Sequence, residues 1–170
     1  MKIKLIEPIA ISLPMLKPVI MAGEEVTRAD NVLVRIETDD GMVGWGEAAS
    51  APVMTGDTLE SIVSAVHYLE PALRGRDPAD IAGAHVAMDG RMYGNHGAKA
   101  AIEIALYDLA GKAYAKALKL NPNHTGALEY QGVLFIKLGQ VDKAKANLAK
   151  IKAISGEGGE EYKDLAEAIG

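Results

Sequence analysis

Apolar residues in the first fifty positions alternate with polar ones, as is typical of β-strands. Residues 2–13 show this alternation and are rich in isoleucine, and residues 31–38 are rich in β-branched residues, which pack well on a pleated surface. Residues 42–47 are expected to return as a third strand. The Asp39–Gly41 segment between the second and third runs predicts a tight turn, because Asp and Gly tolerate positive φ. We therefore expect a three-stranded antiparallel meander. Residues 14–28, with two prolines and a glycine, are expected to be irregular.

Beyond the third strand the apolar spacing becomes helical. Asp57 and Glu60 have the spacing of a capping box and predict the start of a helix. Pro78 stands where a second helix can begin, since proline is tolerated in a first turn. A long amphipathic stretch then ends before Pro122. The helices expected here cover residues 57–73, 78–90 and 98–120.

The last fifty residues predict helices only. Residues 125–138 and 141–154 form two helical runs, separated by a glycine corner at Gly139. Residues 160–169 predict a short final helix. The fold class that follows is α+β, with a three-stranded antiparallel meander and a helical bundle, continued by an antiparallel α-hairpin.

A spacing of 34 residues recurs in the C-terminal part. It relates Ala110, Tyr114, Ala117 and Pro122 to Ala144, Leu148, Ile151 and Gly156. Leu128, Gly132, Phe135 and Gly139 lie between the two sets. The pattern resembles the tetratricopeptide repeat (TPR) over about residues 110–169. Gln131 and Gly156 depart from it, and a generic helical hairpin is the alternative interpretation.

The TPR resemblance also implies a candidate binding face. The residues that would point to the concave side are Glu129, Val133, Ile136 and Lys137. A protein or peptide partner, or self-association, could use this helical surface. Because one repeat builds little of a groove, the favoured alternative is that these side chains are solvated or cover a neighbouring domain.

Three motifs in the N-terminal part point to an enzyme family. They are "ETDDGMVGWGEA" at residues 37–48, "LRGRDPADI" at 73–81 and "AKAAIEIALYDLAGKA" at 98–113. Their residues and their order resemble the N-terminal capping domain of the enolase superfamily, on the mandelate racemase and muconate lactonizing enzyme side. The resemblance covers residues 1–113.

In that family the capping domain lowers two loops over a (β/α)₈ barrel, which holds Mg²⁺ and the catalytic bases. The resemblance maps these loops onto about residues 14–27 and 48–58. Candidates to line a substrate pocket in the parent enzyme are Ile20, Met21, Val53 and Met54, with ordinary loop packing as the alternative. A barrel needs about 200 residues or more, and those after residue 113 read as helices. No catalytic residue, metal ligand or cofactor is therefore assigned to this chain.

Composition narrows the remaining choices. The chain has 170 residues, a net charge of −5 and no cysteine, so disulfides and thiolate metal sites are excluded. Neither half is basic enough to indicate nucleic-acid binding, and no apolar run is long enough to cross a membrane. We expect a soluble, cytoplasmic protein. The four histidines lack metal-ligand spacing, and Trp45 is expected in the core.

These observations lead to two interpretations. In the first, a capping-like domain at residues 1–113 and a TPR-like segment at 114–170 share the helix at 98–120. The chain is then a non-catalytic composite, a chimera with a structural or protein-binding role. In the second, it is a fragment of a Mg²⁺-dependent isomerase or lyase, like mandelate racemase or muconate cycloisomerase. Such a fragment would act on carboxylate substrates only with a barrel supplied in trans.

Overall fold

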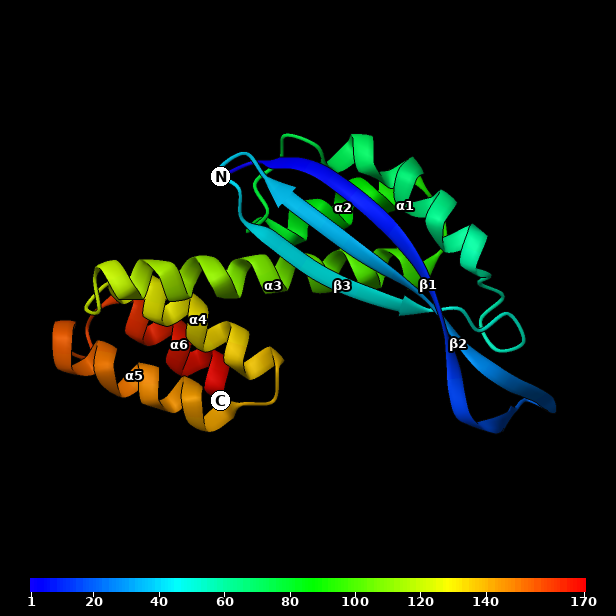
Figure 1. Cartoon of the computed structure of the whole chain (residues 1–170). Coiled ribbons are helices and arrows are strands. Elements are labelled where there is room, and N and C mark those ends of the chain that lie inside the picture. Colours follow the sequence, from blue (N-terminus) through cyan, green and yellow to red (C-terminus); the bar gives the residue numbers. More distant parts are fainter. The chain divides into compact units, whose positions relative to one another are not determined.

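The computed structural model describes all residues from 1 to 170 and contains two compact units, Met1–Leu109 and Ala110–Gly170. The boundary falls inside one helix, α3 (Figure 1). The first unit is α+β and the second is helical. The elements are β1 (Ile3–Met21), β2 (Glu24–Thr38), β3 (Val43–Ala49), α1 (Leu59–Leu73), α2 (Ile81–Arg91), α3 (His96–Leu120), α4 (Thr125–Lys137), α5 (Val141–Ser155) and α6 (Glu160–Ile169).

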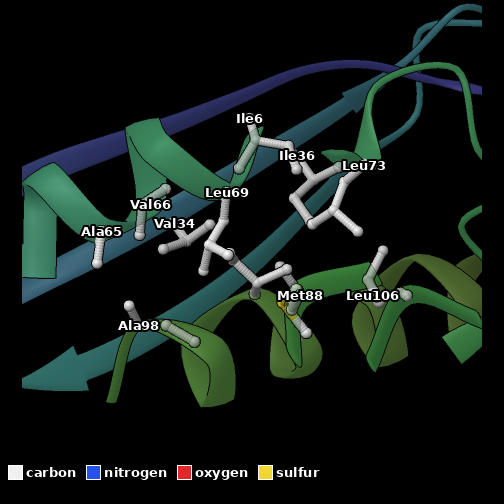
Figure 2. Packing of buried hydrophobic residues seen from close by; sticks show 14 of the residues in the cluster. Ile6, Val34, Ile36, Ala65, Val66, Leu69, Leu73, Met88, Ala98 and Leu106 are labelled. Carbon is white, nitrogen blue, oxygen red and sulfur yellow. The ribbon is translucent and has the colours of Figure 1, made fainter. Parts of the chain in front are cut away.

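The first unit is built on an antiparallel sheet with strand order β1-β2-β3, which confirms the expected three-stranded arrangement. Every second residue of β2 from Val32 to Thr38 is buried, as the period of two predicts for a sheet covered on one face. Helix residues complete the core, among them Leu69, Met88 and Leu106 (Figure 2). Burying these side chains gives this unit its own hydrophobic core.

Two glycines of β3 let α3 pack against the backbone of the strand. A Cβ atom at Gly44 would lie 2.3 Å from the Ala105 carbonyl oxygen, and one at Gly46 would lie 1.9 Å from the Ala101 carbonyl oxygen. Neither distance is compatible with a side chain at these positions. Because residues alternate across a strand, Trp45 points to the opposite face and is 42% exposed. The expectation that Trp45 lies in the core is therefore wrong.

Polar groups of α3 complete its attachment. The Asp108 Oδ2 atom accepts a hydrogen bond of 2.9 Å from the Trp45 N–H. Lys99 is buried, and its Nζ donates to Asp89 Oδ1 at 2.7 Å and to the Met92 carbonyl oxygen at 2.6 Å. Lys99 thus neutralises a carboxylate and satisfies a carbonyl at the end of α2. The hydrogen bond from Lys99 is the main cause that lowers the pKa of the Asp89 carboxyl.

The expectation of an irregular stretch at residues 14–28 is wrong. β1 and β2 continue as a hairpin to the turn residues Ala22 and Gly23, which have φ of 49° and 87°. The pairing shifts between Pro14 and Val19, so the hairpin contains an irregularity but does not end there. Proline did not break the strand, because β1 lies at the edge of the sheet.

Two predicted helix starts also differ from the structure. The cap of α1 is Thr58, whose side chain accepts from Ser61 N while Ser61 Oγ accepts from the Thr58 N–H. The capping box is therefore one residue later than the predicted Asp57 and Glu60. α2 begins at Ile81 after the cap Asp80. The Thr58 and Ser61 hydroxyl groups accept from the Ser61 and Thr58 N–H groups, so the Asp57 side chain is not needed as a cap and can make another contact.

The second unit packs α4, α5 and α6 around a small core that Leu118 at the end of α3 also contacts, with α4 and α5 close to their expected bounds. Leu128, Ile151 and Leu165 form its centre. Gly132 of α4 lies close to α6, since a Cβ there would come within 2.6 Å of the Leu165 side chain. Gly139, at φ 71°, forms the corner that its position predicted.

We predict that Gly46→Ala destabilises the first unit by about 3 kcal/mol or more, because the new methyl group would overlap the α3 backbone. Thermal and urea unfolding followed by circular dichroism would measure the change. Gly90→Ala in α2 is the matched control. A Cβ at Gly90 meets nothing within 4 Å, so this variant should be stabilised by about 0.5–1 kcal/mol. Equal stability of the two variants would contradict the packing argument.

We also predict that Ala22→Asn stabilises the hairpin by about 0.5–1 kcal/mol, because Asn tolerates the positive φ that Ala22 adopts. Amide hydrogen exchange of the neighbouring strand residues should slow. Ala22→Val should have the reverse effect, since a β-branched residue is strained in the left-handed region. If Val protected the hairpin as well as Asn does, the turn conformation assigned here would be wrong.

Candidate functional site

The end of the β1–β2 hairpin and the loop between β3 and α1 line an open pocket of about 300 Å³. The loop is held by backbone hydrogen bonds, with Ser50 N donating to the Asp30 carbonyl oxygen at 2.7 Å and Ala51 N donating to the Asp57 carbonyl oxygen at 3.1 Å. The first bond ties the loop to β2 and the second closes the loop on itself, so two distant segments lie beside one cavity. The lining residues are Met21, Glu24, Glu25, Val26, Thr27, Arg28, Asp30, Ser50, Ala51, Pro52, Val53 and Met54.

Three of the four apolar candidates from the sequence lie at this pocket. Met21 comes from the hairpin, while Val53 and Met54 come from the loop. They remain 40%, 46% and 63% exposed. Ile20 is not part of the lining and is 68% exposed. The pocket thus has an apolar wall that no other part of the first unit covers.

Sequence reasoning missed the polar side of the pocket. The guanidinium of Arg28 donates through Nε to Ser12 Oγ at 2.7 Å and through Nη2 to the Ser12 carbonyl oxygen at 2.8 Å. The Ser12 hydroxyl in turn donates to Asp30 Oδ1. This network spans both hairpin strands and fixes the orientation of Arg28. The signal that could have revealed this network is the strand register, in which Ser12 stands opposite Asp30. This register can be read only once residues 14–28 are recognised as strand.

The pocket can enclose and orient a small ligand. It combines one guanidinium with the carboxylates of Glu24, Glu25 and Asp30, beside the apolar wall. No group of three histidine, aspartate or glutamate side chains in the structure is placed to hold a metal ion. The residues of this chain therefore do not fit a Mg²⁺ site.

A second cavity, of about 410 Å³, lies where β3 ends and α3 begins. Asp57 is part of its wall, together with Glu47 and His96. The Asp57 carboxylate lies against Gly97, where a Cβ would be 3.2 Å from Oδ2. A carboxylate at a helix N-terminus interacts favourably with the helix dipole. Asp57 thus contacts the start of α3 instead of capping α1.

The candidates for a peptide-binding face occupy different environments in the second unit. Val133 and Ile136 are partly buried and pack against the core of this unit. Lys137 is exposed in the last turn of α4. Burial raises the pKa of the Glu129 carboxyl, and the carboxylates of α6 raise it further. The carboxylates concerned are those of Asp164, Glu161 and Glu160.

None of the helices combines the length and apolar character required to span a bilayer. This holds for α3, the longest helix at 25 residues, as well as for the shorter ones.

Comparison with known proteins identifies relatives that match the first unit, one of which matches the whole chain. The sequence profile described as "Mandelate racemase / muconate lactonizing enzyme, N-terminal domain" matches residues 6–119. The L-Ala-D/L-Glu epimerase of Bacillus subtilis is 46% identical over 109 residues, which is 64% of this chain and 30% of the relative. The hydrophobic dipeptide epimerase of Enterococcus faecalis is 31% identical over 185 residues, covering 100% of this chain and 51% of the relative.

Solved structures support the same assignment. The crystal structure of a dipeptide epimerase from Cytophaga hutchinsonii, complexed with Mg and the dipeptide D-Ala-L-Val, matches with a TM-score of 0.65 and 32% identity. The match covers 68% of this chain and 33% of that one. The chain therefore spans between about a third and about half of the length of these relatives.

We predict that Glu129→Gln raises the thermal midpoint of the second unit at pH 7. A raised pKa means that the protonated form favours folding. That contribution is complete below the unfolded value near 4.5 and is lost as pH rises through the folded pKa. The gain should therefore disappear below about pH 4.5. Melting curves at both pH values test it, with the exposed Glu167→Gln on α6 as control. A gain that persists in acid would contradict the assigned cause.

Proposed function

Because this chain belongs to the mandelate racemase / muconate lactonizing enzyme family through its N-terminal domain, we propose that it serves as the capping part of an epimerase- or racemase-type enzyme. The chemistry takes place on a barrel that these residues do not form. The observation that carries the proposal is the profile match over residues 6–119, together with the similarity to a dipeptide epimerase structure.

The substrates proposed for the complete enzyme are small carboxylates, with dipeptides first. The relatives include an L-Ala-D/L-Glu epimerase and a hydrophobic dipeptide epimerase. Epimerisation removes a proton from the carbon next to a carbonyl group and returns it on the other face. Enzymes tune an acid and a base for such a step by their surroundings. We assign neither group to this chain.

The residues of this chain would contact the end of the substrate that is far from the reacting carbon. Met21, Val53 and Met54 would form an apolar cover that excludes water. Arg28, held in place by Ser12, would offer its remaining N–H groups to a carboxylate or a carbonyl oxygen. Closing this wall over a bound substrate would bury side chains that are 40–63% exposed in the free chain.

Magnesium enters only through the relatives, one of which was crystallised with Mg. Since no side-chain cluster here fits a metal ion, no step is assigned to Mg²⁺ in this chain. The metal would be supplied with the barrel.

A second candidate function concerns residues 110–170. We propose that they form a TPR-like segment that binds a protein or peptide, which would make the chain a composite of two modules. Two small residues support this proposal. Gly132 permits close approach of α4 to the Leu165 side chain of α6, and Ala144 is fully buried on α5. A small residue at each of these positions is what the repeat pattern requires. Tyr130, 57% exposed on α4, would be available to a partner.

We predict that the purified chain alone does not exchange substrate α-protons, and that it does so with a separately expressed barrel part of the Bacillus subtilis epimerase. Proton NMR in D₂O with Mg²⁺ and L-Ala-L-Glu would follow the exchange. The mixture should exceed the barrel alone by about tenfold or more, because the cover excludes water and orients the dipeptide.

Matched variants make this test specific. Val53→Asp and Met54→Asp place a charge on the pocket wall without touching the core, so they should lower the rate and leave the fold intact. Leu138→Asp, an exposed position in the second unit, should change nothing. Exchange equal to that of the barrel alone would refute the capping role.

A further inference from the structure

The outer edge of β1 is open to solvent in the first unit. It is therefore the edge at which a strand of a second copy could pair with the sheet. β1 is an edge strand of 19 residues and contacts β2 on one side only (Figure 1). An edge strand presents unpaired N–H and C=O groups, which can pair with the same strand of a second copy. A strand of this length is a long template for such pairing.

The register shows which backbone groups of β1 face outward. Pro8 stands opposite Val34, and Pro14 stands opposite Arg28. A hydrogen-bonded pair needs an N–H from both residues, so neither proline can belong to one. Their backbone groups therefore face the open edge. Alternation along the strand places Ala10 and Ser12 on that edge as well.

An independent contact supports this orientation. Asp30 is the register partner of Ser12, yet its carbonyl oxygen accepts from Ser50 N at 2.7 Å. Asp30 thus turns its backbone away from β1, as a residue in a non-hydrogen-bonded pair must. Ser12 consequently turns its own backbone to the outer edge.

Several outward positions of β1 are already blocked. Ile3 N donates to the Arg76 carbonyl oxygen at 2.9 Å, and the Ile3 carbonyl oxygen accepts from Gly75 N at 2.8 Å. The Ser12 carbonyl oxygen accepts from Arg28 Nη2 at 2.8 Å. Pro8 and Pro14 have no N–H to offer. On the far edge of the sheet, the Trp45 N–H is taken by Asp108.

The positions of the prolines match a symmetric pairing. Two β1 strands related by a two-fold axis at Ile11 would place Pro8 of one copy opposite Pro14 of the other. Ala10 would then stand opposite Ser12. Of the four outward pairs between residues 8 and 14, the two that contain prolines lose their donors, and the two between Ala10 and Ser12 each meet a carbonyl already bound by Arg28. A two-fold dimer through this edge is thereby disfavoured.

We propose that Pro8 and Pro14, with Arg28 on the Ser12 carbonyl, form an edge guard that prevents β1 from pairing with β1 of a second copy. The guard is independent of any catalytic role. It keeps the hairpin as two strands.

The double variant Pro8→Val/Pro14→Val tests the guard in the full chain. It restores two outward donors without breaking a hydrogen bond of the parent. We expect a concentration-dependent dimer by sedimentation and light scattering. Amide exchange at Ala10 and Ser12 should slow by about tenfold or more relative to the parent. Ala10→Val is the matched control, because it adds β-propensity on the same edge but no donor.

Two outcomes would overturn the proposal. One is a double variant with the parent's mass and the parent's exchange at Ala10 and Ser12. The other is an Ala10→Val variant that dimerises equally, which would assign the effect to apolar surface. Circular dichroism checks the fold first. If the double variant loses the circular dichroism spectrum of the parent, the single variant Pro14→Val is used instead. Pro14 is exposed, so its replacement leaves the core intact. The same outcomes then decide.

Discussion

The close approach of α3 to β3 is the contact on which the first unit depends. Gly44 and Gly46 leave no side chain between the strand and the helix, so the backbone carbonyls of Ala101 and Ala105 lie directly over β3. This contact aligns Asp108 with the Trp45 N–H. It also sets Lys99 where it reaches the end of α2. The sheet, α2 and α3 are thus held together by the close packing at Gly44 and Gly46 and by the hydrogen bonds of Asp108 and Lys99.

A second consequence concerns the part of the hairpin farthest from this core. The outer half of β1 and the facing half of β2 carry mostly exposed residues, and their order comes from pairing with each other. A backbone hydrogen bond from Ser50, in the loop after β3, to Asp30 holds this loop beside the end of the hairpin, where the two segments line a pocket. In the proposed capping role, the apolar side chains exposed at this pocket would cover a bound substrate. The same exposed strand could pair with β1 of a second copy, and the prolines at its outer edge remove the N–H groups that this pairing would use.

The sequence predicted most of the elements, because each carries its own period. The strands around Val34 and the helix through Leu106 follow from alternation and from 3.6-residue spacing. The sequence predictions were wrong where a local pattern is compatible with two different structures. Pro14 and Pro18 indicate an irregular segment in isolation, but an edge strand accepts both, and edge position is a property of the sheet. Thr58 capped α1 instead of Asp57 because Ser61 completes a reciprocal pair.

By itself the sequence determined the α+β class, the three-stranded meander, the helical C-terminal part and the apolar residues Met21, Val53 and Met54 as candidates. The fold class and the elements follow from composition and periodicity, and the candidates are what the family resemblance of three motifs implies; all of these are local along the chain. Only the tertiary structure decided that these residues share a pocket with Arg28, that Trp45 faces away from the core, and that Val133 and Ile136 pack inward. Such facts depend on register and on which residues from distant segments meet. A linear pattern does not contain them, because a shift of one residue in a strand exchanges its two faces.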